Sequence, residues 1–176
     1  MDLKNKNRVF LGVFFFLSGF CFSSWASRIP TIKTNFHFNE AELGTLLLCM
    51  PISSLIGLPI SGWLTAKYDT RQPLFIGFIV NVICLSLIGF ADSTYLLVAA
   101  VSMYAFSMRI TNIAINTQAI NLQKQFDRKI NGSFHGLWST GGIVGVAFST
   151  LLIALKVNMQ VHLLIATVLT LIVLVF

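Results

Sequence analysis

The chain has 176 residues, of which 56% are hydrophobic and only 10% charged, and its mean hydropathy is +0.82. Soluble domains carry about 25% charged residues, and a chain this short has no interior that could hide so much apolar sequence, so the composition excludes a soluble globular protein. The formal net charge of +6 would suit a nucleic-acid-binding protein. The basic residues flank apolar stretches, however, so we interpret them as a membrane-topology signal and expect no nucleic-acid partner.

Six apolar stretches predict an all-α membrane protein with six transmembrane helices in a single domain, residues 1–176. A helix rises ~1.5 Å per residue, so about 20 apolar residues cross a hydrocarbon core of ~30 Å. The first five stretches are long enough, or nearly so, and the sixth runs to Phe176 without a polar flank, which suggests half of a larger protein. The predicted helices cover residues 9–26, 43–64, 74–91, 95–119, 133–155 and 161–176.

The basic residues predict the orientation of these helices. Eight of the twelve precede the first helix or lie in the loops after the second and fourth helices, so they fall on one side of the membrane. Because cytoplasmic loops carry an excess of Lys and Arg, the N-terminus is predicted to be cytoplasmic. The eight residues are Lys4, Lys6, Arg8, Lys67, Arg71, Lys124, Arg128 and Lys129.

The first outer loop, residues 31–42, lies between two signals for helix ends. Before it, Trp25 and Arg28 suit the outer membrane interface, where aromatic side chains and cationic anchors are common. At its end, Asn39 followed by Glu42 fits a capping box, in which the Asn side chain accepts from the first turn and the Glu side chain reaches back. The second helix is therefore predicted to begin next to Asn39.

The helix predicted over residues 95–119 is unusually polar. At ~100° per residue, five positions fall within about 80° of one another and form a stripe that lipid cannot satisfy. Arg109 lies near the middle of this span, where insertion scales give about 2.5–3.5 kcal/mol for an Arg. No acidic residue lies in any predicted span, so Arg109 pairs with backbone carbonyls, an anionic substrate or a group outside this chain, unless it snorkels to one membrane face. The stripe comprises Ser102, Ala105, Arg109, Asn112 and Asn116.

The helix predicted over residues 133–155 combines a titratable side chain with small residues. His135 and Gly142 share one face of this helix. Histidine titrates near neutral pH, so His135 is a candidate proton relay, with a packing role as the alternative. Gly142 and Gly145, with Gly141 beside them, would allow a neighbouring helix to approach closely.

Other polar and sulfur-containing residues in the spans are expected to have structural roles. Asn81 is the one strongly polar side chain of its helix and is predicted to form an interhelical hydrogen bond. Cys21, Cys49 and Cys84 lie in three different helices without metal-ligand spacing, so they are expected to be packing residues. No acid within a span pairs with His135, and no nucleophile–base or phosphate-binding motif occurs. We therefore expect no enzyme activity, no catalytic residue, no metal site and no cofactor.

The run at residues 62–71 resembles the signature G-x-L-a-D-r-x-G-r-[RK] of the major facilitator superfamily. Gly62, Leu64, Lys67 and Arg71 fit it, whereas an alanine stands where the family has its acidic residue. The resemblance implies that these four residues form a cytoplasmic gating loop that helps couple helix movements.

Three further segments, residues 24–33, 111–118 and 135–142, are similar to the first outer loop and the fourth and fifth helices of a bacterial branch of transporters related to fucose permease. The resemblance implies a fold of two six-helix halves with the substrate between them at the midplane, of which this chain is the N-terminal half. It also implies a location in the bacterial plasma (inner) membrane and a second six-helix half as a partner within the lipid bilayer.

The function that this resemblance implies is transport of a small polar solute, a sugar or an organic anion, by alternating access. Transport would be secondary active, with coupling to a proton or sodium gradient, although Asn112 cannot carry a proton and stands where sugar–proton members commonly have an acid. The alternative hypothesis is a truncated or split scaffold half without transport activity of its own. The residues expected in the substrate pathway are Ser24, Arg109, Asn112, Asn116 and Trp138.

Overall fold

The computed structural model describes residues 2–175, and Phe176, the end of the last predicted span, lies outside the described residues. Within residues 2–175 every regular element is a helix, which confirms the all-α prediction. The elements are α1 (Leu3–Ala26), α2 (Ile29–Asn35), α3 (Glu40–Lys67), α4 (Arg71–Phe90), α5 (Thr94–Gln123), α6 (Asn131–Ala154) and α7 (Met159–Val175).

The long helices suit a membrane in length and composition. Five segments are long and apolar enough to cross it, namely α1 with the adjoining α2, and α3 to α6, whereas α7 is apolar but shorter. α2 is a seven-residue helix, and all of it from residue 31 onward lies in the predicted outer loop. Other bounds differ because hydropathy marks only the apolar part of a helix: α1 begins at Leu3 instead of residue 9, and α5 ends at Gln123 instead of residue 119.

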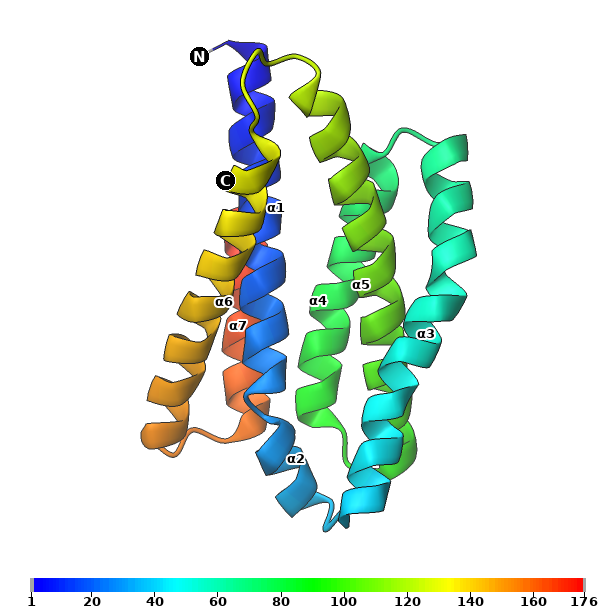
Figure 1. Cartoon of the computed structure of the whole chain (residues 1–176). Helices are drawn as coiled ribbons and strands as arrows, with labels where there is room; N and C mark the ends of the chain where they lie inside the picture. Colours follow the sequence, from blue (N-terminus) through cyan, green and yellow to red (C-terminus); the bar gives the residue numbers. More distant parts are fainter. Residues whose placement is uncertain (1, 176) are drawn as a thin grey trace.

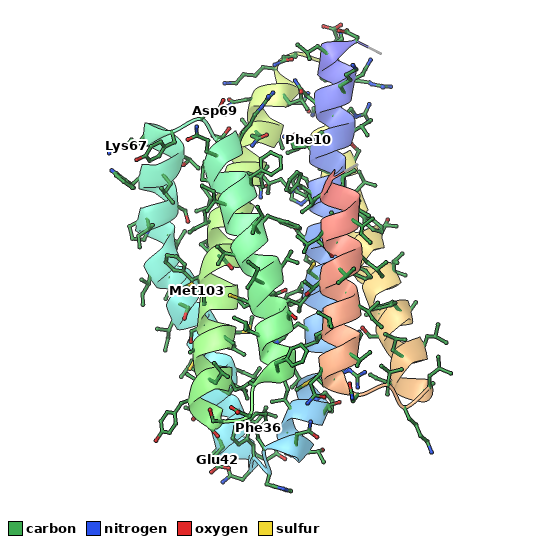
Figure 2. All side chains as sticks on the ribbon, turned by 180° about the vertical axis from the view of Figure 1, so that it is seen from behind. Phe10, Phe36, Glu42, Lys67, Asp69 and Met103 are labelled. Atoms are coloured by element: carbon green, nitrogen blue, oxygen red, sulfur yellow. The ribbon has the colours of Figure 1, made fainter. Side chains whose placement is uncertain are left out.

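The helices form two layers. Helices α6, α1, α5 and α3 stand side by side in the layer at the front of Figure 1, and α7 and α4 lie behind it. Figure 2, from the opposite side, shows α4 and α7 in front, with Lys67 and Asp69 at the end opposite Phe36 and Glu42. The N-terminus and the loops after α3 and α5 meet at one end, so the eight basic residues gather there as the sequence predicted.

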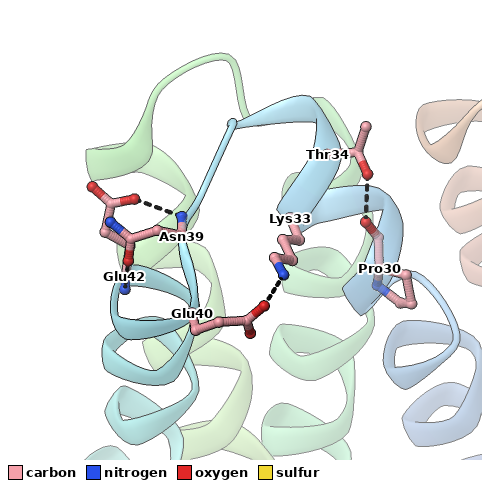
Figure 3. Close-up of polar contacts among 6 residues, drawn as sticks. All are labelled: Pro30, Lys33, Thr34, Asn39, Glu40 and Glu42. Carbon is pink, nitrogen blue, oxygen red and sulfur yellow. Dashed lines mark hydrogen bonds and ion pairs between the residues drawn. The ribbon is translucent and has the colours of Figure 1, made fainter.

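The connection from α1 to α3 is fixed by polar contacts at the opposite end of the bundle (Figure 3). The Glu42 backbone N–H donates to Asn39 Oδ1 at 2.9 Å, and the Asn39 N–H donates to Glu42 Oε2 at 2.8 Å, which confirms the predicted capping box. Lys33 forms an ion pair with Glu40, and the Thr34 hydroxyl donates to the Pro30 carbonyl at 3.1 Å. These contacts order the turn that sets where α3 begins.

Helices α1 and α6 are in backbone contact. A Cβ added at Gly141 would overlap the carbonyl oxygen of Phe16, and one at Gly19 would overlap the carbonyl of Trp138. At Gly145 the added Cβ would lie 2.7 Å from a carbonyl oxygen of α1. The prediction that the α6 glycines admit a close neighbour is therefore confirmed, and the neighbour is α1. This contact brings the ring of Trp138 beside the central helices.

Candidate substrate cavity

A cavity of about 220 Å³ lies between α1, α3, α4, α5 and α6. Arg109 and Ser54 lie near the middle of α5 and α3, so the cavity reaches mid-depth of the bundle. Its volume is below the roughly 300–1,000 Å³ of drug-sized sites, which suits a small solute. The lining residues are Phe15, Ser18, Phe22, Ser54, Asn81, Met108, Arg109, Thr111, Asn112, Ile115, Asn116, His135 and Trp138.

Arg109 is held by α3. Its Nε donates to Ser54 Oγ at 2.7 Å, and its aliphatic stem packs on Gly57, where an added Cβ would lie 3.2 Å from Arg109 Cβ. Within residues 2–175 the terminal nitrogens of Arg109 have no hydrogen-bond acceptor. The partner on the protein is therefore a hydroxyl of the neighbouring helix, and not the backbone carbonyls that are one of the predicted alternatives.

Two asparagines continue the polar side of the cavity along α5. Asn116 Nδ2 donates to the Asn112 carbonyl at 2.8 Å and lies 3.3 Å from Asn112 Oδ1. The Asn112 side chain is exposed, whereas the Thr111 hydroxyl is buried without a hydrogen-bond partner. Asn81 of α4 donates to the Tyr104 carbonyl at 3.0 Å, which confirms the predicted interhelical hydrogen bond.

The opposite wall of the cavity is aromatic. The Trp138 ring lies 6.4 Å from that of Phe22, and the His135 ring meets Phe15 edge-on with centroids 5.6 Å apart. Trp138 is 39% exposed, so its ring is available to a solute. His135 has no hydrogen-bond partner within residues 2–175, and its role as a proton relay stays a prediction.

Ser24 differs from the other predicted pathway residues, since it does not line the cavity. Its side chain is fully buried, and its hydroxyl donates to the Phe20 carbonyl of its own helix at 2.8 Å. A serine within a helix commonly satisfies its hydroxyl in this way. The hydroxyl that α1 contributes to the cavity is that of Ser18. Ser54 of α3 lines the cavity as well, and no pattern in the sequence points to either serine.

A second buried polar cluster lies at the end of the bundle where α1 is followed by α2 and α6 by α7. Arg28 Nε donates to His162 Nδ1 at 2.7 Å, and Arg28 Nη2 donates to the Val157 carbonyl at 2.8 Å. Ser149 Oγ lies 3.2 Å from His162 Nε2. The position of Arg28 in the sequence suggested an interface anchor, but its side chain is only 4% exposed. Arg28 instead links the turn after α1 to the corner between α6 and α7.

The four residues of the loop signature lie where α3 passes into α4. Gly62, Leu64 and Lys67 belong to the last turns of α3, and Arg71 is the first residue of α4. Arg71 Nη2 lies 3.5 Å from the side-chain oxygen of Asn7 on α1. The loop thus contacts the helix that carries the N-terminal basic residues.

These features define a multi-pass membrane protein with a polar, solute-sized cavity at mid-depth. The profile of the Major Facilitator Superfamily matches residues 10–176, and the chain belongs to this family, in its N-terminal six-helix half. The branch related to fucose permease stays a prediction.

Several curated bacterial proteins are similar to the chain. An uncharacterized MFS-type transporter of Yersinia pestis is 34% identical over 82% of this chain, and an uncharacterized transporter of Sinorhizobium fredii is 30% identical over 88%. A nitrite extrusion protein of Bacillus subtilis is 26% identical over 71% of the chain. The chain spans 38%, 41% and 30% of the lengths of these three relatives. No solved structure gives a significant match.

Proposed function

We propose that the chain forms half of a carrier that moves a small polar solute across a bacterial plasma membrane by alternating access. The observation that carries this proposal is the mid-depth cavity, where four of the five predicted pathway residues meet. They are Arg109, Asn112, Asn116 and Trp138. Membership of the Major Facilitator Superfamily and the transporter names of the relatives support the same function.

The chemistry of the cavity suits a sugar or an organic anion. The amides of Asn112 and Asn116 can bind hydroxyl groups, and the Trp138 ring offers a face on which a sugar stacks. Arg109 offers a cation for a negatively charged group, and the name of the Bacillus subtilis relative states that an anion is the cargo of that protein. A proton or sodium gradient would supply the energy, with His135 as the candidate relay.

A second six-helix half would cover the layer of α6, α1, α5 and α3. In the apolar windows of α3 and α6 only 17% of residues are buried. Ile143 of α6 is 71% exposed and Leu55 of α3 is 65% exposed. Apolar faces this large mark contact with lipid or with another protein surface. Residues of the loop at Lys67 and Arg71 would couple the halves, with the N-terminus in the cytoplasm.

The test is solute uptake into membrane vesicles that contain the chain together with a second six-helix half. Arg109→Gln and Asn116→Ala are expected to lower uptake or the affinity for the solute, because both side chains line the cavity. Ser24→Ala is the matched control and should leave uptake unchanged. The site assignment is wrong if both cavity variants transport like the parent. A folded protein that transports no sugar or organic acid in a broad screen would support the scaffold alternative.

A further inference from the structure

We propose that the cavity is an anion site, in which the terminal nitrogens of Arg109 hold a carboxylate or a similar planar oxyanion of a small organic solute. This inference rests on the proposed function, since it takes the cavity as the place where the solute binds. It selects the organic anion over the neutral sugar and names the group that binds it.

The first support is the charge of the cavity. The lining residues include Arg109 and no carboxylate. Both ion pairs within residues 2–175 lie elsewhere, because they join Lys4 to Asp2 and Lys33 to Glu40. A cation at mid-depth of a membrane protein is costly without a counter-charge, and such residues face partners or water-filled paths. An anionic solute would supply the charge that the described residues do not.

The second support is the geometry of the guanidinium. The bond from Nε to Ser54 and the packing of the stem on Gly57 fix Arg109 from the α3 side. The two terminal nitrogens are left without an acceptor among residues 2–175, in a residue that lines the cavity. A guanidinium offers parallel N–H donors that match the two oxygens of a carboxylate, and an orientation fixed in advance reduces the entropy lost on binding.

The third support comes from the other lining groups. The rings of Phe22 and Trp138 and the side chains of Met108 and Ile115 form apolar walls in the same cavity. These walls favour a solute with a carbon body beside its charged group over a bare inorganic ion.

The test uses iodide as the anionic probe and acrylamide as a neutral one, because both quench tryptophan fluorescence on contact. The chain, in detergent or in vesicles with a second half, carries three tryptophans. Trp25 is 2% exposed, whereas Trp63 and Trp138 are 54% and 39% exposed. Trp63 is first replaced by phenylalanine. The fluorescence of Trp138 is then the part of the signal that a further Trp138→Phe substitution removes.

Relative to free tryptophan, iodide is expected to quench Trp138 more efficiently than acrylamide does. Arg109→Gln should lower the iodide quenching constant about threefold or more, because a fixed cation concentrates anions in a cleft. Arg109→Lys keeps the positive charge, so it should keep part of the iodide quenching of Trp138. Unchanged acrylamide quenching shows that Arg109→Gln still folds. Lys67→Gln is the control, since Lys67 does not line the cavity.

Two results would overturn the proposal. Iodide quenching of Trp138 that is equal in the parent and in Arg109→Gln would show that Arg109 attracts no anion into the cavity. Competition separates the classes of ligand: gluconate should protect Trp138 from iodide at concentrations where sorbitol, its neutral counterpart, does not. Equal effects of gluconate and sorbitol would exclude a carboxylate site. Both readouts measure binding at equilibrium. A protein that binds gluconate but takes up no solute therefore contradicts the transport function and leaves the anion site standing.

Discussion

Arg28 and Arg109 both pack within the helix bundle, and their surroundings differ. Arg28 is 4% exposed, and its guanidinium donates to His162 and to the Val157 carbonyl. Arg109 is half-buried, and within residues 2–175 it donates only to the Ser54 hydroxyl. The protein thus surrounds one cation with acceptors and leaves the other partly open to a cavity.

The difference separates a structural cation from a binding one. Removing an arginine whose acceptors are buried leaves those acceptors unsatisfied, so the folded state loses free energy. Removing an arginine that has few protein partners costs little, and it also relieves the cost of a cation at mid-depth. Stability and ligand binding should therefore respond oppositely at Arg28 and Arg109.

The largest expected effect concerns the contact between α1 and α6, which holds the surroundings of both arginines in place. Gly141→Leu should destabilise the protein by about 3 kcal/mol or more, since its side chain would have to displace the backbone of α1 at Phe16. Gly136→Leu on the same helix is the control, because no atom lies within 4 Å of a Cβ added there. Unfolding of both variants in detergent, followed by circular dichroism, gives the comparison. Equal stability of the two variants would mean that α1 and α6 are not in backbone contact.

Arg28→Ala should give the next largest loss, about 2–3 kcal/mol, because His162 and the Val157 carbonyl lose a charged donor in a buried site. The measurement is the same unfolding transition, with Lys33→Ala as the control because the ion pair of Lys33 with Glu40 is exposed. A double-mutant cycle with His162→Ala should show a coupling of at least about 1 kcal/mol between the two side chains. Additive losses would instead place the imidazole outside the reach of Arg28.

Asn39→Ala should cause a smaller loss, about 1 kcal/mol, because it removes the side-chain acceptor for the first turn of α3. This variant measures how much an exposed helix cap contributes to the free energy of unfolding, for comparison with the buried cluster around Arg28. Hydrogen exchange should become faster at the amide of Glu42 and leave the α6–α7 corner unchanged. An unchanged exchange rate at Glu42 would show that the capping box does not protect this turn.

Local signals in the sequence predicted much of the fold. Apolar runs marked the spans, Asn39 and Glu42 marked the start of α3, and Gly141 and Gly145 marked a face for close packing. Each of these features depends on residues a few positions apart, whose mutual geometry a helix fixes. Hydropathy could not give the polar ends of the helices, which is why α1 begins earlier than predicted.

Helical spacing also accounts for part of the lining of the cavity. Arg109, Asn112 and Asn116 share one face of one helix, so their common presence in the cavity follows from helical spacing. Ser24 does not line this cavity, because spacing alone does not tell which side of α1 meets it. The bond between Arg28 and His162 joins residues 134 positions apart, and only the packing of α7 against its neighbours brings them together.

The most direct test of the account compares Arg28→Gln with Arg109→Gln in one unfolding experiment on otherwise identical protein. We predict that Arg28→Gln lowers Tm by about 4 °C or more, and that Arg109→Gln changes Tm by less than about 2 °C. Such a result would assign Arg28 to the structure and leave Arg109 free for a ligand. A loss of stability in Arg109→Gln that equals or exceeds the loss in Arg28→Gln would contradict the account, because Arg109 would then be a structural brace.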